Sequence, residues 1–364
     1  MTVAVGIVGA GFISDTYLEN LTAFPDIRVV GVADLDVDRA RGQAAKYGVP
    51  WGGSFADLLA LPEVEIVVNL TVPAVHVEVS LAAVEAGKHV WTEKPIGLDR
   101  QTVRKLLDRA REKGVRVAGA PDTVLGAGQQ TALRVLADGR IGEPGTALAL
   151  FQTPGPEGWH PTPEFLFQEG GGPLLDIGPY YLTQLVQVFG AVRKVTGIGG
   201  RGRETRVIGS GPRAGTEFPV AVPTTVSALV EFVRGGSAQV LLTFDSALRR
   251  TGFVEVSGVL GTAVLPDPNR FDGSTVLHLA GAEGPEEVAA VGHAASRGVG
   301  VLELARAIRA GVPERASGEL AYHVVDVMVA VEESMARGVG VEVASRVGVG
   351  EPLPVGWDPF SRTL

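Results

Sequence analysis

A glycine-rich turn early in the sequence has the spacing of a phosphate-binding loop. The apolar run Val3–Val8 leads into Gly9–Ser14 (GAGFIS), and a helical pattern begins near Phe12. Glycines at the first two motif positions let the backbone approach a pyrophosphate, whose charge then faces the N–H groups and dipole of the helix. The third position holds Ser14, which is small enough to keep the helix near the strand. The alternative is a glycine-rich turn of another α/β fold. The predicted dinucleotide-binding residues are Gly9, Gly11, Phe12 and Ile13.

An acidic residue follows the second predicted strand. Asp34 lies about 20 residues beyond the glycine turn, where a carboxylate accepts hydrogen bonds from the ribose of adenosine. Its negative charge repels a 2′-phosphate, so the sequence favours NAD as the cofactor. Arg39 and Arg41 are close in sequence and keep NADP as the alternative. The competing interpretation makes Asp34 a helix cap or a turn residue.

A lysine follows another predicted strand. Lys88–Trp91 leads into Thr92-Glu93-Lys94-Pro95, which brings a carboxylate and an ammonium to the strand end where open α/β sheets bind ligands. Pro95 fixes its own φ and pushes Lys94 toward an extended conformation. The position of this lysine is therefore expected to be stiffer than that of an ordinary surface lysine.

Three segments carry a resemblance to a known family: Glu93-Lys94-Pro95, Asn69–Pro73 with His76, and Gly170–Tyr180. On these residues the sequence resembles the glucose-fructose oxidoreductase, inositol dehydrogenase and rhizopine-catabolism family, called Gfo/Idh/MocA. The resemblance implies a Rossmann domain followed by a domain with a mostly antiparallel sheet. It also implies cofactor contacts from Thr71, Pro73, His76, Glu93 and Lys94.

The sequence departs from the family pattern at two places. Many members carry an Asn-Arg-Phe-like segment that contacts nicotinamide and substrate, where this sequence has residues 120–124 (APDTV). Many members also place a histidine four residues after the aspartate of the second motif, and here that position is Tyr180. These differences leave the substrate open and change the acid-base group.

The resemblance points to catalytic roles for Lys94, Asp176 and Tyr180. In the oxidising direction we expect Tyr180 to take the proton of the substrate hydroxyl and Lys94 to polarise the oxygen of that hydroxyl. We expect Asp176 to have an orienting role in the site. Tyrosine has an ordinary pKa of about 10, and nearby positive charge favours the phenolate. If residues 175–188 form one helix, Asp176 and Tyr180 share a face, although Pro179 complicates such a helix. The alternative makes Asp176 a helix-start residue and Tyr180 a core aromatic.

One histidine lies in a proline-stiffened loop before the second motif. His160 stands in the segment Trp159–Pro163 (WHPTP). It is predicted to hydrogen-bond a sugar hydroxyl of the substrate or to replace Tyr180 as the base, and a solvent-facing loop residue is the alternative. The acid-base group thus stays open among Tyr180, Lys94 and His160. No cluster of His, Asp and Glu has the spacing of a metal site, so we expect no metal.

The elements that must position these residues form two contrasting halves. Residues 3–118 alternate β-branched runs with helical patterns, which is typical of a parallel sheet with helices on both faces. From about Val192 to Leu279 strand patterns follow one another, and Gly235-Gly236 indicates a hairpin. We predict an α/β Rossmann domain with a parallel sheet over residues 1–122. We predict an α+β domain with a mostly antiparallel, open-faced sheet over residues 123–364.

Composition excludes several classes of function. The sequence has no cysteine, which rules out disulfides, thiolate metal sites and a cysteine nucleophile. Lys and Arg total 32 against 41 Asp and Glu, giving a formal charge of −9, whereas a nucleic-acid partner needs a positive face. No apolar segment reaches the roughly 18 residues of a membrane span. We expect a cytoplasmic protein with neither nucleic acid nor membrane as partner.

The motifs and the resemblance together predict an NAD-dependent dehydrogenase or reductase. Its substrate would be a secondary alcohol or hemiacetal of a sugar, cyclitol or related polyol. The first alternative is NAD-dependent, redox-assisted glycoside hydrolysis, which the same fold and motifs support in a few relatives. The second is a non-catalytic dinucleotide-binding regulator, which would not need Lys94, Asp176 and Tyr180 together.

The strands of the second half predict a protein partner. Val226–Val233 and Gln239–Phe244 carry apolar residues on both alternations, more than one buried sheet face needs. Too few helical patterns remain to cover the other face, and family members commonly pair through it. We predict a homodimer or a dimer of dimers. The alternative is that a loop such as Arg201–Val222 folds over the sheet.

Overall fold

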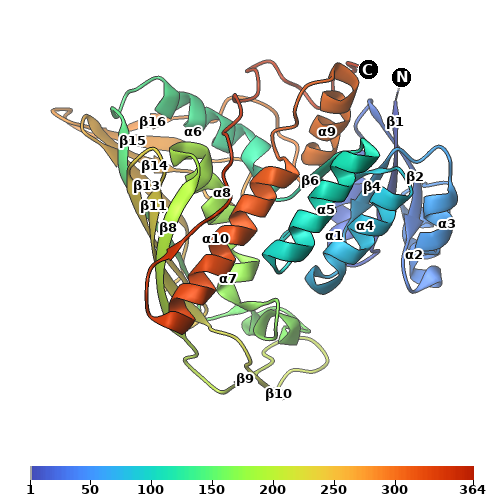
Figure 1. The fold of residues 1–364 in the computed structure, drawn as a ribbon, viewed down its shortest axis with the longest axis horizontal. Coiled ribbons are helices and arrows are strands. Elements are labelled where there is room, and N and C mark those ends of the chain that lie inside the picture. Colours follow the sequence, from blue (N-terminus) through green and yellow to red (C-terminus); the bar gives the residue numbers. More distant parts are fainter. Residues whose placement is uncertain (1) are drawn as a thin grey trace. The chain divides into compact units, whose positions relative to one another are not determined.

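The chain passes more than once between two structural units. The computed structural model describes residues 2–364 (Figure 1). Unit 1 comprises the described residues up to Ala127 together with Gly292–Tyr322 and Leu353–Leu364, and unit 2 comprises Gly128–Val291 and His323–Pro352. Each of the two units is thus built from more than one segment of the chain, whereas each predicted domain, 1–122 and 123–364, is a single segment. The division of the chain into these two domains stays a prediction.

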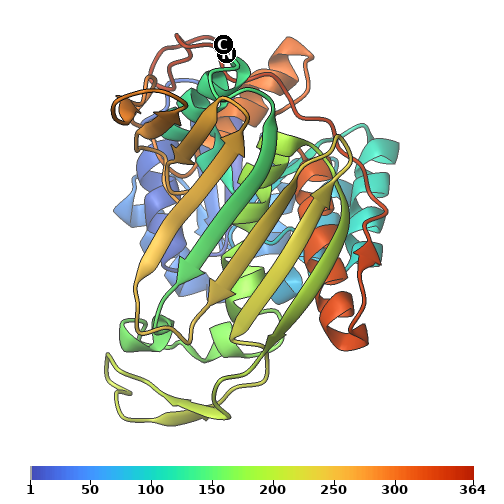
Figure 2. The same cartoon turned by 90° about the vertical axis from the view of Figure 1, so that its left-hand side faces the viewer.

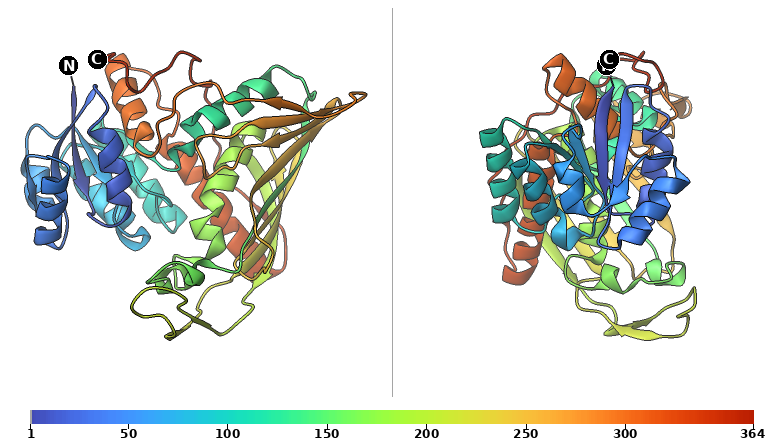
Figure 3. Two further views of the ribbon diagram at one scale, coloured as in Figure 1. Left: turned by 180° about the vertical axis from the view of Figure 1, so that it is seen from behind. Right: turned by 90° about the vertical axis from the view of Figure 1, so that its right-hand side faces the viewer.

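A fully parallel sheet forms the centre of unit 1. Its strands run in the order β3-β2-β1-β4-β5-β6, and every neighbouring pair is parallel. Helices lie on both sides of these strands (Figure 3, right), so the predicted Rossmann architecture is confirmed. From β1 the chain adds β2 and β3 on one side, and it then adds β4, β5 and β6 on the other side. The place between β1 and β4 is therefore the switch point where open sheets bind ligands. The strands are β1 (Val3–Val8), β2 (Ile27–Ala33), β3 (Gly52–Gly53), β4 (Ile66–Asn69), β5 (His89–Thr92) and β6 (Val117–Gly119).

Side-chain caps define where several helices of unit 1 begin. Asp36, Ser54 and Asp99 each accept a hydrogen bond from a backbone N–H in the first turn that follows, which stabilises a helix start. These residues precede α2, α3 and α5. The helices of unit 1 are α1 (Ile13–Leu21), α2 (Val37–Lys46), α3 (Phe55–Ala60), α4 (His76–Glu85), α5 (Arg100–Lys113) and α9 (Val299–Ala310), with 3-10 turns η1 (Pro73–Val75) and η2 (Asp122–Leu125).

The core of unit 1 joins segments that are far apart in the sequence. Tyr17 of α1, Trp91 of β5 and Leu302 of α9 are completely buried in one apolar cluster. α9 approaches so closely that a Cβ added to Gly300 would lie 2.0 Å from the Trp91 ring. The late helix α9 is therefore an integral part of the nucleotide-binding unit.

A nine-stranded sheet forms the centre of unit 2. The strands run in the order β16-β15-β14-β13-β7-β12-β11-β8-β17. Among the described residues β7 and β12 are its only parallel neighbours, so the predicted mostly antiparallel sheet is confirmed. The strands are β7 (Pro144–Gln152), β8 (Val192–Gly200), β11 (Thr225–Phe232), β12 (Ser237–Thr243), β13 (Arg250–Gly258), β14 (Gly261–Leu265), β15 (Thr275–Leu279), β16 (Glu286–Val288) and β17 (Val341–Glu342).

One face of this sheet is covered by helices and the other is open. α8 and the unit 2 part of α10 lie behind the strands in Figure 2, and no helix of unit 2 lies in front of them. On β11, Val230 is fully buried, whereas Leu229, on the open face, is 56% exposed. The small hairpin of β9 (Thr205–Val207) and β10 (Glu217–Pro219) lies beyond the strand ends and does not cover this face. The helices that complete unit 2 are α6 (Ala127–Ala137), α7 (Gly172–Asp176), α8 (Gly178–Phe189) and α10 (Gly318–Arg337).

Candidate functional site

A cavity of about 480 Å³ lies at the switch point of the parallel sheet in unit 1. Four predicted cofactor residues line it together: Gly9, Gly11, Asp34 and Thr71. Much of the remaining wall is apolar and includes Leu35, Phe55, Val72, Val75 and Val79. A glycine loop beside an apolar slot fits a dinucleotide, with phosphates at the loop and the adenine ring in the slot. The predicted residues that do not line this cavity are Phe12, Ile13, Pro73, His76, Glu93 and Lys94.

The two glycines of the loop differ in what they contribute. Gly9 has φ +100°, and a Cβ added there would lie 2.6 Å from the carbonyl oxygen of Leu70. A side chain at this position would therefore clash with the end of β4. A Cβ on Gly11 would meet nothing within 4 Å, so the space beside that residue is open to a ligand. The pair has the geometry of the predicted phosphate cradle.

The start of α1 supplies backbone donors to this cradle. The Phe12 side chain is 95% exposed, and α1 begins at Ile13, so these residues can contact a phosphate through their N–H groups. Ser14 is buried, and its Oγ donates a hydrogen bond to the Gly11 carbonyl at 2.6 Å. Serine thus fits the third motif position by bonding within the turn.

Asp34 ties the end of β2 to the glycine loop. Its Oδ2 accepts a hydrogen bond from the Ala10 N–H at 2.7 Å, and its Oδ1 accepts one from Arg39 at 2.6 Å and one from the Asp36 N–H at 2.9 Å. Burial raises the pKa of Asp34, but the hydrogen bonds from Arg39 and the two N–H groups outweigh it, so the pKa lies below its usual value. A carboxylate can accept about four hydrogen bonds, which leaves one for a ribose hydroxyl. No sequence pattern indicates the contact between Asp34 and the Ala10 N–H.

Asn69 organises the loop that follows β4. Its side-chain amide donates to the His76 carbonyl at 3.0 Å, and its Oδ1 accepts from the Thr71 hydroxyl at 2.6 Å. The His76 ring is buried between the carbonyl oxygens of Pro95, at 2.6 Å, and Thr71, at 2.9 Å. Burial lowers the pKa of His76. The neutral ring has a single N–H, so it donates a hydrogen bond to one of these two carbonyl oxygens. The ring lies between this loop and the segment after β5. Pro73 begins the turn η1 of the same loop.

Glu93 faces the interior of unit 1. Its Oε1 accepts a hydrogen bond from the Tyr17 hydroxyl at 2.7 Å, and its Oε2 accepts one from the Lys94 N–H at 3.0 Å. Trp91 Nε1 donates to the same tyrosine oxygen at 3.1 Å. Burial raises the pKa of Tyr17, so its hydroxyl stays protonated as the donor. This network fixes the backbone of Lys94 at the carboxyl end of β5, where its side chain is half-buried.

The segment at 120–124, where the sequence departs from the family pattern, supports α9. Asp122 is completely buried, and its Oδ2 accepts hydrogen bonds from the N–H groups of Gly298 at 2.8 Å and Gly300 at 3.3 Å. Burial raises the pKa of Asp122 to about 6. The side chain therefore faces the start of α9 rather than the cavity.

The second motif lies in unit 2 and is split between two helices. Asp176 is the last residue of α7, and Tyr180 lies in the first turn of α8, so the condition of a single helix over 175–188 is not met. The break at Ile177 arises because Pro179 has no N–H to donate, and the Tyr180 N–H bonds the Ile177 carbonyl at 3.1 Å. Asp176 and Tyr180 are thus placed by adjoining short elements, and Tyr180 is buried.

His160 lies on an exposed loop of unit 2. Its Nδ1 accepts a hydrogen bond from the Thr162 N–H at 3.1 Å. In the neutral ring the proton then resides on Nε2, which becomes a donor. This geometry favours the predicted hydroxyl contact over the use of His160 as the base.

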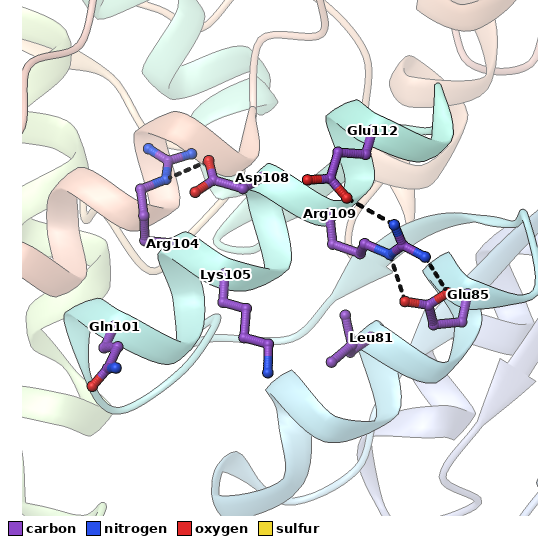
Figure 4. A pocket seen from close by; sticks show the side chains of 8 residues that line it. All are labelled: Leu81, Glu85, Gln101, Arg104, Lys105, Asp108, Arg109 and Glu112. Carbon is purple, nitrogen blue, oxygen red and sulfur yellow. Dashed lines mark hydrogen bonds and ion pairs between the residues drawn. The ribbon is translucent and has the colours of Figure 1, made fainter.

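A second cavity of unit 1 lies between α4 and α5 (Figure 4). Arg109 pairs with Glu85 and Glu112, and Arg104 pairs with Asp108. The acidic and basic groups of this groove neutralise one another, so it offers no concentrated charge for a ligand. Lys105 points into the same groove (Figure 4).

Residues 2–364 contain neither a cluster of metal-ligating side chains nor a membrane-spanning helix. No group of three or more His, Asp or Glu side chains in this range could hold a metal ion. No helix in this range is long and apolar enough to span a membrane.

Family models match most of the chain. Residues 3–120 match the oxidoreductase family with an NAD-binding Rossmann fold, and residues 129–264 match the Gfo/Idh/MocA C-terminal domain. The chain belongs to the Gfo/Idh/MocA oxidoreductase family. It is thus an oxidoreductase whose unit 1 contains an NAD-binding Rossmann domain, in agreement with the glycine cradle and the cavity.

Curated Gfo/Idh/MocA relatives cover nearly three quarters of the chain. Trans-1,2-dihydrobenzene-1,2-diol dehydrogenase of Mus musculus is 31% identical over 273 residues, which are 72% of this chain and 74% of the relative. The 1,5-anhydro-D-fructose reductase of Ensifer adhaerens is 29% identical over 272 residues, covering 71% and 74%. A levoglucosan dehydrogenase in complex with NADH and levoglucosan aligns with a TM-score of 0.83 at 21% identity, covering 94% of this chain and 100% of that one. This structural likeness supports the fold.

Proposed function

We propose that the protein transfers a hydride between NAD and a secondary alcohol or hemiacetal of a sugar, cyclitol or related polyol. The observation that carries the proposal is the placement of Lys94 by Glu93 at the carboxyl end of β5, in the unit that contains the glycine cradle. The names of the diol dehydrogenase, the anhydrofructose reductase and the levoglucosan dehydrogenase all denote hydroxylated ring compounds. These relatives support that class of substrate.

The proposed reaction divides the work among a few side chains. Gly9, Gly11, Asp34 and Thr71 would hold NAD, which would supply the hydride acceptor for the carbinol carbon in the oxidising direction. Tyr180, in its phenolate form, which the positive charge of Lys94 would favour, accepts the proton of the same hydroxyl. Lys94 stabilises the developing charge on the hydroxyl oxygen, and Asp176 orients the substrate. The glycine loop, held by Asp34, binds and orients the cofactor phosphates.

A screen for reduced-cofactor formation tests the proposed function. The protein is incubated with NAD or NADP and a panel of sugars, inositols and aryl diols, and absorbance of the reduced nicotinamide is followed. We expect NADH to form with at least one hydroxylated ring compound. Cleavage of an aryl glycoside without net NADH would instead favour redox-assisted hydrolysis. Cofactor binding without turnover across the panel would favour a regulator.

The Asp34–Arg39 pair predicts a preference for NAD. In the unaltered protein NADH should bind more tightly than NADPH, because the ionised Asp34 repels a 2′-phosphate. Asp34→Ser should weaken the binding of NADH, since the Ala10 contact is lost. It should also narrow the difference between the affinities for NADH and NADPH. Fluorescence titration of the reduced cofactors measures both affinities. Arg39→Ala serves as the control and should leave NADH affinity nearly unchanged; equal affinities in the unaltered protein would contradict the prediction.

The open face of the nine-stranded sheet predicts a homodimer or a dimer of dimers. Leu229 and Ile198 of this face are 56% and 71% exposed, and burying them against a second copy is favourable. Sedimentation at micromolar concentration should give at least twice the chain mass, and Leu229→Glu should lower it. Val259→Glu is the control. It changes another apolar residue, which is 87% exposed in the turn after β13, and it should leave the sedimenting mass unchanged. A monomeric unaltered protein would refute this prediction.

The cytoplasmic location of the protein also stays a prediction.

A further inference from the structure

Three aromatic rings lie together on the loop of unit 2 that contains His160. The His160 ring makes edge contacts with Trp159, at 5.5 Å between centroids, and with Phe165, at 5.4 Å. Trp159 is 65% exposed and Phe165 is 52% exposed. We call these three residues the aromatic platform. Exposed apolar surface of this kind on an ordered loop marks a site of interaction.

The aromatic platform is held in place by buried polar contacts. Arg206 is 1% exposed in its side chain and pairs with Glu157, just before the platform, and with Asp245. The backbone N–H groups of Trp159 and His160 both donate to the Pro156 carbonyl, at 3.1 and 2.8 Å. The rings are therefore positioned before any ligand arrives, which lowers the entropic cost of binding.

The aromatic platform also presents one directed polar group. Because His160 Nδ1 accepts the Thr162 N–H at 3.1 Å, the neutral ring carries its proton on Nε2. No hydrogen bond to Nε2 is found within residues 2–364, so this donor is available to a ligand. Flat apolar rings with a single donor match a ligand that has an apolar face and hydroxyl groups.

The aromatic platform adjoins the second motif within unit 2. η4 (Glu164–Phe167) packs against α7, and a Cβ added to Gly171 would lie 2.6 Å from the Phe165 carbonyl oxygen. Gly171 precedes α7, whose last residue is Asp176. A ligand on the platform is thus held beside the element that positions Asp176.

We propose that the aromatic platform binds the ring of a cyclic polyol or sugar. The C–H face of the ring stacks on Trp159 and Phe165, and a hydroxyl accepts a hydrogen bond from His160 Nε2. This inference rests on the proposed function and narrows its substrate class to ring compounds over open-chain polyols. The exposed parts of these side chains amount to a few hundred Å² at most. A stable protein interface buries roughly 600 Å² or more on each partner, which these three side chains do not supply, so a second copy fits this patch poorly.

Kinetics with matched ring and open-chain substrates test the aromatic platform. Trp159→Ala and Phe165→Ala should each raise KM for an active cyclic substrate about 10-fold, with kcat and the KM for an open-chain polyol changed much less. Trp159→Phe should recover most of the loss. His160→Gln, which keeps a donor, should retain more affinity than His160→Leu. Phe360→Ala, an aromatic of unit 1 with 51% exposure, is the control and should leave both KM values unchanged.

Three outcomes would overturn the aromatic platform as a ring-binding site. They are an unchanged KM for the ring substrate, an equal rise for ring and open-chain substrates, and a change in sedimenting mass of Trp159→Ala. Failure of the proposed function would look different, since the unaltered protein would then form no NADH with any substrate. In that case the change in tryptophan fluorescence on adding inositols, compared between the unaltered protein and Trp159→Phe, still decides whether the platform binds rings.

Discussion

Lys94→Ala should lower turnover by at least about 100-fold while changing NAD affinity much less. The backbone N–H of Lys94 donates to the buried Glu93 carboxylate, which places the base of its side chain at the carboxyl end of β5. In the proposed mechanism, removing the ammonium would take away the charge that stabilises the developing alkoxide in the transition state. Turnover of the best substrate from the screen, with NADH titration alongside, measures the two effects.

Two lysine variants sharpen this test. Lys105→Ala removes a lysine of the same unit from the α4–α5 groove (Figure 4) and should leave turnover nearly unchanged. Lys94→Arg keeps the charge but cannot release a proton near neutral pH, so a substantial recovery of turnover would assign an electrostatic role. A Lys94→Ala protein with near-normal turnover would make this lysine structural only.

Arg206→Met should destabilise unit 2 by about 3–5 kcal/mol. The arginine is buried between the carboxylates of Glu157 and Asp245 and lies over the Phe167 ring at 5.1 Å. Without its guanidinium both carboxylates remain in a poorly solvated site with no countercharge. Urea denaturation followed by circular dichroism gives the change in the free energy of unfolding.

A nearby ion pair provides the control for Arg206. Arg213 pairs with Glu164 on the same part of unit 2, but its side chain is 51% exposed, and such pairs contribute only about 0–1 kcal/mol. Arg213→Met should therefore have little effect. If both substitutions lowered the free energy of unfolding by a similar amount, burial would not be the reason for the large effect at Arg206.

The parallel half was predictable because its signals are local. The predicted strand Val3–Val8 coincides with β1, which is buried along its whole length, and strands buried on both faces read as continuous apolar runs. The helix over Arg100–Lys113 is bounded by the Asp99 cap and by Gly114 in the left-handed region. Each of these boundaries depends on residues within the segment or directly next to it.

Other features depend on partners that the sequence does not indicate. The run Pro144–Gln152 contains a single β-branched residue and therefore has a weak strand pattern, yet β7 lies between β12 and β13 in the middle of the second sheet. The acceptor role of Glu93 depends on Tyr17, which is 76 positions away. Spacing also cannot show that Asp122 turns toward α9. The orientation of each of these groups is set by tertiary packing.

The interleaving of the units has a consequence for how the protein is made. A ribosome adds about 5–20 residues per second, so unit 2 residues 128–291 take roughly ten to thirty seconds to emerge. During that time the nascent nucleotide-binding unit lacks α9, and the Trp91 ring, against which Gly300 packs, has one side uncovered. Synthesis from the N-terminus thus leaves this unit with exposed apolar surface while the sheet of unit 2 is still being translated. The core of unit 1 is completed only when α9, which follows that sheet in the chain, has been synthesised.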